Sequence, residues 1–424
     1  MTENTPPAER PPAPVVASAR AETSALLVTI LGALGLIPIG GGLALWVYGL
    51  FTGDTQFTMY GGAFVAVGLA GVGLVASGVR YLRPGPAARL KPQRWWLVLL
   101  VVLFPAALGV GTAAAVIDGL TPWLLPLAHV VAVIAPILGV LYIALWGRPA
   151  LTQFSGWSHL LGGAWGAVVI ALALEILVAA LLVGVVLVIN QLFPDFLADL
   201  VRLINNPAVL ADASVEDLVA TLARPEIVLL AWVLAGVFVP IIEELLKPMG
   251  VAIALLLGRQ LSPRAGFIAG VLGGLGFALT ESLLNAATPG PAWVVTIVAR
   301  VGTLFMHATA SGFIGWGLAQ AVQARRVFPA IRGLLVGVGL HAGWNSLVVL
   351  IVGSSVLAVT NNSMAVMVVM VLVSVVAFGL LILLGATSIA LLVWASWHLA
   401  RQETPPPPAT RAASIEPPTL AVPY

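Results

Sequence analysis

The chain alternates long apolar stretches with short polar connections, and this pattern predicts helices that cross a membrane. A hydrocarbon core about 30 Å thick takes about 20 residues of α-helix to span. Ten stretches are long enough, at approximately 25–51, 58–79, 95–117, 123–146, 162–190, 227–257, 265–287, 293–320, 333–352 and 364–398. The pattern predicts an all-α, polytopic membrane protein, because a β-barrel would show alternating segments of about ten residues instead.

Composition supports this class and excludes several chemistries. Of the 424 residues, 60% are hydrophobic and only 8% are charged, whereas soluble domains carry about 25% charged residues. The absence of cysteine excludes disulfides, thiolate catalysis and cysteine-ligated zinc. The basic residues form no run typical of nucleic-acid binding, so we expect the lipid bilayer and no nucleic acid among the partners.

The distribution of basic residues predicts the orientation in the membrane. If the N-terminus is cytoplasmic, 15 of the 19 lysines and arginines fall in cytoplasmic connections and tails. The connections on the other side hold only Arg202 and Arg224, while Lys247 and Arg300 lie within spans. Because cytoplasmic connections of membrane proteins are enriched in Lys and Arg, we expect both termini to be cytoplasmic.

Composition and charge also suggest how the chain is organised. The first residues are Pro- and Ala-rich and precede a full-length span, which favours a cytoplasmic tail over a cleaved signal peptide. We expect six regions: a disordered tail (1–24), an accessory five-helix region (25–190), an extracytoplasmic amphipathic loop (191–226), a four-helix core (227–352), a final transmembrane helix (364–400) and a disordered cytoplasmic tail (401–424).

Ionisable residues inside the predicted spans are concentrated in the four-helix core. A charged side chain at mid-membrane costs roughly 2.5–3.5 kcal/mol on insertion scales, so such residues are rare and usually functional. Five of the six Glu, Lys and Arg positions fall between residues 243 and 300. The intraspan residues are Glu175, Glu243, Glu244, Lys247, Glu281, Arg300, His129, His307 and His341. The chemistry is therefore assigned to residues 227–352.

One helix carries two adjacent glutamates and a lysine. Lys247 follows Glu243 by four residues and Glu244 by three, so it can pair with either. One carboxylate is then left without a cation, as a general acid or base requires, although an ion pair that only aids packing has the same spacing. Pro240 and Pro248 flank the motif, and we expect them to kink the helix and free carbonyl groups.

The next two helices carry a second polar group. Phe277, Glu281 and Asn285 recur every four residues and so share one helix face. At about 1.5 Å per residue, Glu281 and Arg300 both lie about 10 Å from the outer boundary, which predicts that they pair. Glu175 could pair with Arg300 or line a cavity.

By the same count, His307 and His341 lie at the depth of the two glutamates, roughly 15–25 Å from the outer boundary. We therefore expect both histidines in the site. The remaining histidines, His129, His159 in a loop and His398 at the interface, are interpreted as structural.

Four motifs on four successive helices resemble the PrsW family of intramembrane proteases. The motifs lie within residues 227–352 and are EELLK (243–247), FALTE (277–281), HATASG (from 307) and HAGWN (341–345). The family shares a superfamily with the type II CAAX prenyl endopeptidases. The resemblance implies an integral membrane protease of a bacterial cell membrane. It also implies a membrane-anchored protein substrate, such as an anti-sigma factor.

The resemblance also implies roles for individual residues. Glu243 and Glu244 would activate the hydrolytic water, while His307 and His341 would orient it or stabilise the oxyanion. Glu281 would complete the catalytic set. The supporting residues would be Lys247, which tunes the glutamate pair, Asn345 as a polarising amide, and Arg300, Phe277 and Asn285. Ser282 departs from the family pattern, which often has Asn directly after the second-helix glutamate; Asn285, one turn further, is the candidate replacement.

Metal dependence is the open question of this sequence. Zinc is possible, with Glu281, His307 and His341 as ligands. However, the chain has no HExxH motif, and Lys247 beside the carboxylates would compete with a cation, which favours glutamate chemistry without a cofactor. Two other classes fit less well: a non-catalytic scaffold has no need of both glutamates, and a proton-coupled transporter usually shows two repeats with matching broken helices.

Overall fold

The computed structural model describes residues 25–30, 32–83, 86–117, 119–192, 224–360 and 363–403. Within these ranges the chain is helical, and its only pairing of extended segments is an isolated bridge between Arg89 and Thr152. The helices are α2 (Ile37–Thr52), α3 (Thr55–Tyr81), α4 (Trp95–Val116), α5 (Thr121–Ala144), α6 (Gln153–Leu161), η1 (Gly162–Ala167), α7 (Val168–Leu192), α11 (Pro225–Ala231), η2 (Trp232–Phe238), α12 (Val239–Leu246), α13 (Met249–Leu256), α14 (Pro263–Asn285), α15 (Trp293–Ala324), α16 (Phe328–Thr360) and α17 (Met364–Gln402).

Ten helices of the described chain are long and apolar enough to cross a membrane, which confirms the predicted fold class and number of spans. Two spans differ from the expected bounds. The fifth begins at Gln153 rather than 162, so that His159 lies in a helix and not in a loop. The sixth ends at Leu246 rather than 257, because the helix is interrupted before Pro248, which has no N–H to continue the hydrogen-bond ladder. The predicted tails and most of the external loop, residues 1–24, 193–223 and 404–424, lie outside the described residues.

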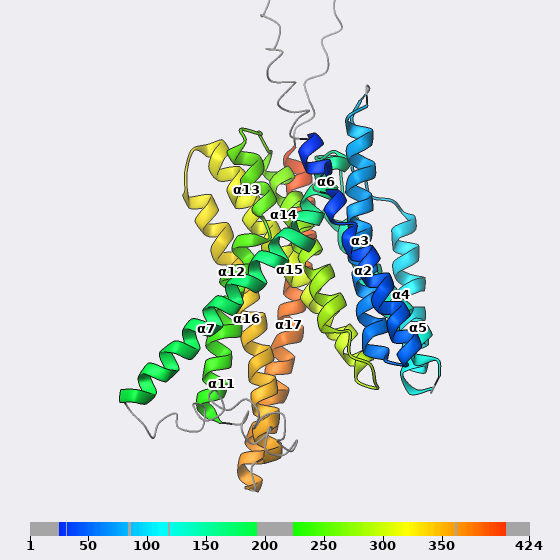
Figure 1. Ribbon diagram of the computed structural model, residues 1–424. Helices are drawn as coiled ribbons and strands as arrows, with labels where there is room; N and C mark the ends of the chain where they lie inside the picture. The colour runs from blue at the N-terminus through cyan, green and yellow to red at the C-terminus, as the bar shows by residue number, and fades with distance from the viewer. Residues whose placement is uncertain are drawn as a thin grey trace, which may run out of the picture.

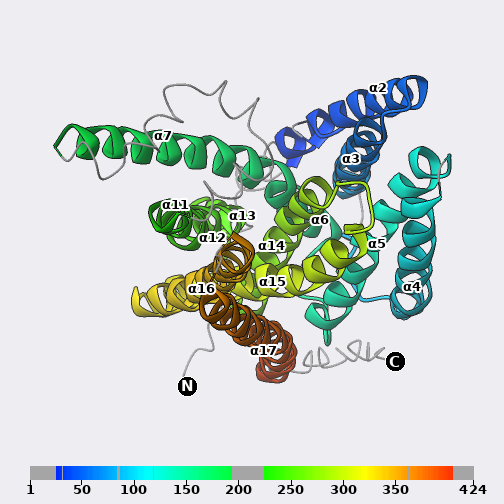
Figure 2. The same ribbon diagram turned by 90° about the horizontal axis from the view of Figure 1, so that it is seen from below.

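Helix α14 is the centre of the molecule (Figure 2). Of the 18 residues in its most apolar stretch, 89% are buried, compared with 6% in the corresponding stretches of the fifth and tenth spans. Helices α3, α5, α6, α13 and α15 all pack against it. Glycine permits this packing: a Cβ atom at Gly274 would lie 2.5 Å from the carbonyl oxygen of His307 on α15. The backbones of α14 and α15 therefore approach closely at the level of the site.

The other helices form two groups around this centre. Helices α2 to α5 lie together on one side, and α11 to α13 with α16 and α17 lie on the other (Figure 1). Helix α7 leans away from the bundle in both views (Figures 1 and 2). Among the described elements, α7 contacts η1, α12, η2 and α14, so it borders the helix that carries the two glutamates.

A buried arginine fastens one end of the bundle. The guanidinium of Arg264, at the start of α14, donates 2.6 Å hydrogen bonds to the carbonyl oxygens of Trp146 and Arg148. It also forms a 2.6 Å ion pair with Glu403, directly after α17. These three contacts join the connection after α5, the first turn of α14 and the end of the last helix.

Candidate active site

The ammonium group of Lys247 lies at the centre of a buried polar cluster. Its Nζ atom is 2.7 Å from Oε2 of Glu243 and 2.6 Å from Oε1 of Glu244. The same atom is 2.6 Å from Nδ1 of His307 and 3.4 Å from Nδ1 of His341. Side chains from α12, α15 and α16 therefore meet around one cation, which lies between α12 and α13 where the helix is interrupted.

Glu244 has a hydrogen-bond partner at each carboxylate oxygen. Its Oε1 accepts from Lys247 and from Nδ1 of His341, 3.0 Å away. Its Oε2 accepts a 2.9 Å hydrogen bond from the hydroxyl group of Ser311 on α15. The residue is completely buried. Because these donors use its acceptor sites and exclude solvent, Glu244 anchors the three helices to one another.

Glu243 is less well satisfied than its neighbour. Its Oε2 lies 2.7 Å from the ammonium nitrogen of Lys247, yet no donor reaches this buried oxygen with hydrogen-bond geometry. The atom is also 3.8 Å from Nε2 of His341, which is too long for a direct hydrogen bond. A gap of this length between two polar atoms is one that a water molecule can bridge. Glu243 is therefore the carboxylate of the pair that has acceptor capacity to spare.

His307 connects this cluster to a second carboxylate. A lysine ammonium can only donate, so Nδ1 of His307 is the acceptor from Lys247 and Nε2 carries the proton. Nε2 in turn donates a 2.8 Å hydrogen bond to Oε2 of Glu281 on α14. Arg300 holds this carboxylate from the other side, with contacts of 3.2 Å to Oε1 and 2.8 Å to Oε2. The pairing of Glu281 with Arg300 expected from their common depth is present.

The Glu281–Arg300 pair forms the partly exposed edge of the cluster. The side chains of Glu281 and Arg300 are 23% and 16% exposed, whereas that of His307 is 1% exposed. Asn285, the candidate replacement, donates to Oε1 of Glu281 at 3.3 Å. Ser282, at the position where the family often has Asn, accepts a 3.1 Å hydrogen bond from Nε of Arg300.

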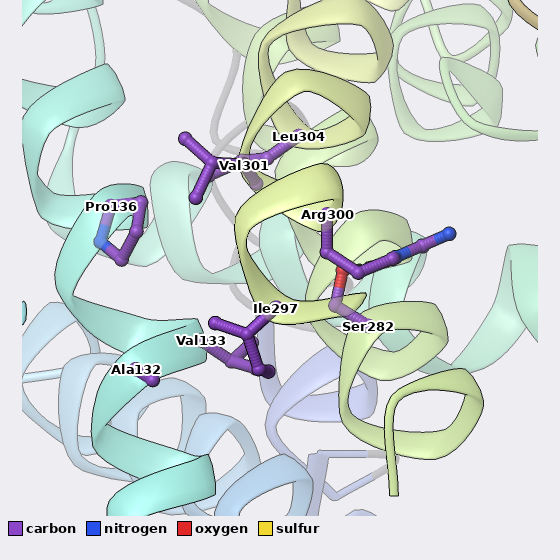
Figure 3. A pocket seen from close by; sticks show the side chains of 8 residues that line it. All are labelled: Ala132, Val133, Pro136, Ser282, Ile297, Arg300, Val301 and Leu304. Carbon is purple, nitrogen blue, oxygen red and sulfur yellow. Dashed lines mark hydrogen bonds between the residues drawn. The ribbon is translucent and has the colours of Figure 1, made fainter. Parts of the chain in front are cut away.

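A small cavity lies beside this edge, between α5, α14 and α15. Arg300 and Ser282 line it together with apolar side chains such as Val133, Pro136 and Ile297 (Figure 3). Its volume of about 10 Å³ is close to the minimum that one water molecule needs. The Arg300 edge of the polar cluster thus borders a space that is polar on one side and about the size of a single water.

Asn345 lies apart from the cluster and has a structural partner. In η2 the N–H of Val239 bonds to the carbonyl of Leu234, five residues back. The next carbonyl in this register, that of Ala235, would bond to residue 240, which is a proline and has no N–H. The side-chain amide of Asn345 donates to the Ala235 oxygen at 2.9 Å instead. One N–H of the amide is therefore bound to the backbone, while the polarising role implied by the resemblance stays a prediction.

Phe277 closes the cluster on the side of α14. The ammonium nitrogen of Lys247 lies 4.5 Å from the centre of its ring, a cation–π contact. Its ring centre is also 5.8 Å from that of His307. Because the ring covers the cation with an apolar surface, Phe277 shields the ion pairs from lipid and solvent.

One group of side chains is close enough to hold a metal ion. Ligand atoms of Glu243, His307 and His341, all buried, lie within 4.8 Å of one another. The sequence suggested the same two histidines with Glu281 as the third ligand, whereas in this group the carboxylate is that of Glu243. The side chain that lies among these ligand atoms is Lys247.

Two further intraspan residues have distinct environments. His129 is buried, and its Nε2 lies 2.9 Å from the carbonyl oxygen of Leu283 in the last turn of α14. Its Nδ1 accepts from the indole N–H of Trp293 at 3.2 Å, so this histidine has the structural role expected of it. Glu175 forms no ion pair with Arg300 within the described chain, and its Oε1 is buried without a hydrogen-bond partner there.

One contributor to the site was missed by the sequence reasoning, namely Ser311, which donates to Glu244. Ser311 follows His307 by four residues and so shares its helix face, which was the available signal. Pro240 was expected to free a carbonyl group, but that this carbonyl belongs to Ala235 depends on the π-helical register of η2, for which the sequence gives no comparable signal.

Comparison with known proteins gives one match. A family model described as PrsW family intramembrane metalloprotease matches residues 155–378, more than half of the chain. The matched region begins in α6 and ends in α17, so it is wider than the 227–352 range of the four motifs and includes α7. None of the curated proteins and none of the solved structures compared matches the chain.

Proposed function

The chain belongs to the PrsW family of intramembrane metalloproteases, and from this premise we propose that a glutamate-activated water is its nucleophile. The substrate is a membrane-anchored protein, cut within or near its membrane segment. The protein itself is an integral membrane peptide hydrolase by its family and its spanning helices. A bacterial cell membrane is its proposed location, and a regulator of the anti-sigma-factor type is its proposed substrate.

The observation that carries the proposal is the gap between Glu243 and His341. The carboxylate oxygen of Glu243 has no aligned donor, and Nε2 of His341 lies 3.8 Å from it. Since Nδ1 of His341 donates to Glu244, its Nε2 is an acceptor. A water in the gap can donate one hydrogen to each, which directs a lone pair at a peptide carbonyl. Glu243 then takes the proton as general base.

The remaining residues of the cluster hold this pair in place. Glu244 fixes the ring of His341 through Nδ1, and Lys247 keeps two carboxylates side by side in an apolar environment. The Lys247 ammonium is also the nearest positive charge to the water position, and it offsets the negative charge that develops on the tetrahedral intermediate.

Glu281 and Arg300 together orient His307. Glu281 accepts the Nε2 proton of His307, and Arg300 holds Glu281 with two contacts. The ring of His307 therefore presents Nδ1 to Lys247 and directs the ammonium toward the glutamates. We assign Glu281 and Arg300 a positioning role, since they act on the reacting atoms only through His307.

The described residues do not fit a zinc ion together with Lys247. One glutamate and two histidines are a ligand set that catalytic zinc takes, with bonds of about 2.0–2.2 Å. Nζ of Lys247, however, is 2.7 Å from the Glu243 oxygen and 2.6 Å from the His307 nitrogen that would bind the metal. An ion bound to these atoms would overlap the ammonium group and repel its charge. We therefore derive no catalytic step through a metal.

The experiment compares wild type with single-residue variants in two steps. Membrane proteomes from cells with wild type and with Glu243→Gln are searched for single-pass proteins that are shortened only by the wild type. The substrate found is then cleaved in proteoliposomes by Glu243→Gln, Glu244→Gln and His341→Ala. We expect Glu243→Gln to lower the rate by about 10²–10⁴-fold, because a general base is lost.

Glu226→Gln is the matched control, because this glutamate lies at the start of α11, pairs with Arg224 and is away from the cluster. It should cleave at the wild-type rate. Wild-type rates in all three cluster variants would refute the proposed site. A substrate that binds and is never cut would indicate a scaffold instead.

A further inference from the structure

Glu175 is an ionisable residue that the proposed mechanism does not use. It is the single charged residue of α7, whose other positions are almost entirely apolar. A carboxyl group in the middle of such a helix costs roughly 2.5–3.5 kcal/mol on insertion scales, and residues of this kind usually serve a function. Its Oε1 is buried and has no hydrogen-bond partner among the described residues.

The face of α7 that carries Glu175 packs against the site. Ala167 and Ala171 form a cluster with Phe277 of α14, against which Ile242 and Leu246 of α12 pack. Glu175 follows Ala171 by four residues and so lies one turn further along the same face. Phe277 is the residue whose ring covers Lys247. The carboxyl group is therefore next to the cluster and not on the lipid side of α7.

Oε1 of Glu175 has no hydrogen-bond partner among the described residues, whereas Oε2 of Glu243 has the Lys247 ammonium 2.7 Å away but no donor aligned with it. Glu175 is also within electrostatic range of Glu243 and Glu281. A buried acceptor without a donor costs about 1–3 kcal/mol, so a bound molecule that supplies a donor to Glu175 would be stabilised. A peptide bond in a transmembrane helix is shielded by the helix and has to be unwound before water can reach it. Unwinding frees main-chain N–H groups, which need acceptors in an apolar medium.

We propose that Glu175 is a substrate-binding residue that accepts a hydrogen bond from a main-chain N–H of the unwound substrate, next to the bond that the Glu243-activated water attacks. The inference rests on the proposed function and adds a site on α7, which the family match includes but the four motifs do not. Recognition of this kind uses the peptide backbone, so it is independent of the substrate side chains.

The test is a double-mutant cycle between the protein and a synthetic single-pass peptide that carries the identified cut site. In the peptide, each main-chain N–H around the cut is replaced in turn by an ester oxygen, which removes the donor. In the protein, Glu175→Met removes the acceptor, while Glu175→Gln keeps a carbonyl oxygen. Leu177→Met, on the exposed side of α7, is the matched control.

We expect Glu175→Met to lower kcat/KM by about tenfold on the normal peptide, which corresponds to one hydrogen bond at a buried site. At one ester position the wild type should show the same loss, and Glu175→Met should add nothing further. Glu175→Gln and Leu177→Met should stay close to wild type.

If the loss of kcat/KM from Glu175→Met and the loss from the ester multiply at every ester position, Glu175 does not bind a main-chain N–H. The proposed function would remain intact. Glu175→Gln could instead be as impaired as Glu175→Met, with the defect confined to peptides that carry a basic side chain. Glu175 would then bind a cationic side chain of the substrate and not its main chain. A wild-type protein that cuts no membrane peptide would overturn the proposed function and this inference together.

Discussion

Replacing Lys247 by methionine removes the one positive charge that two buried carboxylates share. The side chains of Lys247 and Glu244 are 0% exposed and that of Glu243 is 7% exposed, so solvent cannot compensate for the loss. Breaking a buried ion pair by removal of one partner costs about 3–5 kcal/mol. Methionine keeps most of the apolar length of the side chain and removes the ammonium together with its cation–π contact with Phe277, so the change acts mainly on charge. We expect the free energy of unfolding to fall by about 3–5 kcal/mol.

The assay is equilibrium unfolding of the purified protein in mixed micelles, with Lys247→Met, Glu244→Gln and the double variant. Because Glu244→Gln removes one of the uncompensated charges, the double variant should be more stable than the sum of the single changes predicts, by about 0.5–3 kcal/mol. Lys91→Met is the matched control, since the chain's other lysine is exposed in the connection before α4. It should unfold as the wild type does.

Wild-type stability in Lys247→Met would refute the reasoning, because it would mean that the ammonium does not neutralise the carboxylates. Strictly additive losses in the double variant would also count against it. In that case Lys247 and Glu244 would stabilise the fold independently, and the charge network around Lys247 would not exist in the membrane protein.

Two further predictions follow from the same geometry. Purified Lys247→Met, dialysed against zinc and then against zinc-free buffer, should retain about one zinc per chain by elemental analysis, because removal of the ammonium frees the donors described above; stoichiometric zinc in the wild type would contradict the assignment. Asn345→Leu should lower the free energy of unfolding by about 1–3 kcal/mol, because the Ala235 carbonyl loses its donor. An unchanged unfolding curve for Asn345→Leu would show that this carbonyl is satisfied in another way.

Depth along the predicted helices was the most informative feature of the sequence for the site. A rise of 1.5 Å per residue placed Glu281 and Arg300 at one level, and the structure has them in contact. The same count grouped the two glutamates with His307 and His341, which surround Lys247. Long apolar helices have few ways to place an ionisable side chain, so depth and helix face together restrict its partners strongly.

The details that depend on local backbone register could not be obtained in this way. Pro240 and Pro248 were expected to kink one helix, but the structure has a π-helical segment before Pro240 and an interruption before Pro248. The role of Asn345 follows from that segment, because a one-residue change of register decides which carbonyl is left free. Which glutamate keeps an open acceptor likewise depends on the position of Ser311, across a helix interface that periodicity does not define.

The ion pair between Arg264 and Glu403 also has a consequence for the order of synthesis. Arg264 lies in the first turn of the central helix, whereas Glu403 is the last described residue, so of these three contacts the guanidinium can make only the two with carbonyls until residue 403 has been synthesised. Helix α17 also supplies packing for α15 and α16, which carry both histidines of the cluster. The contacts that α17 makes with the two histidine-bearing helices, and the ion pair at its end, can therefore form only after residue 403 has been synthesised, long after α14 itself.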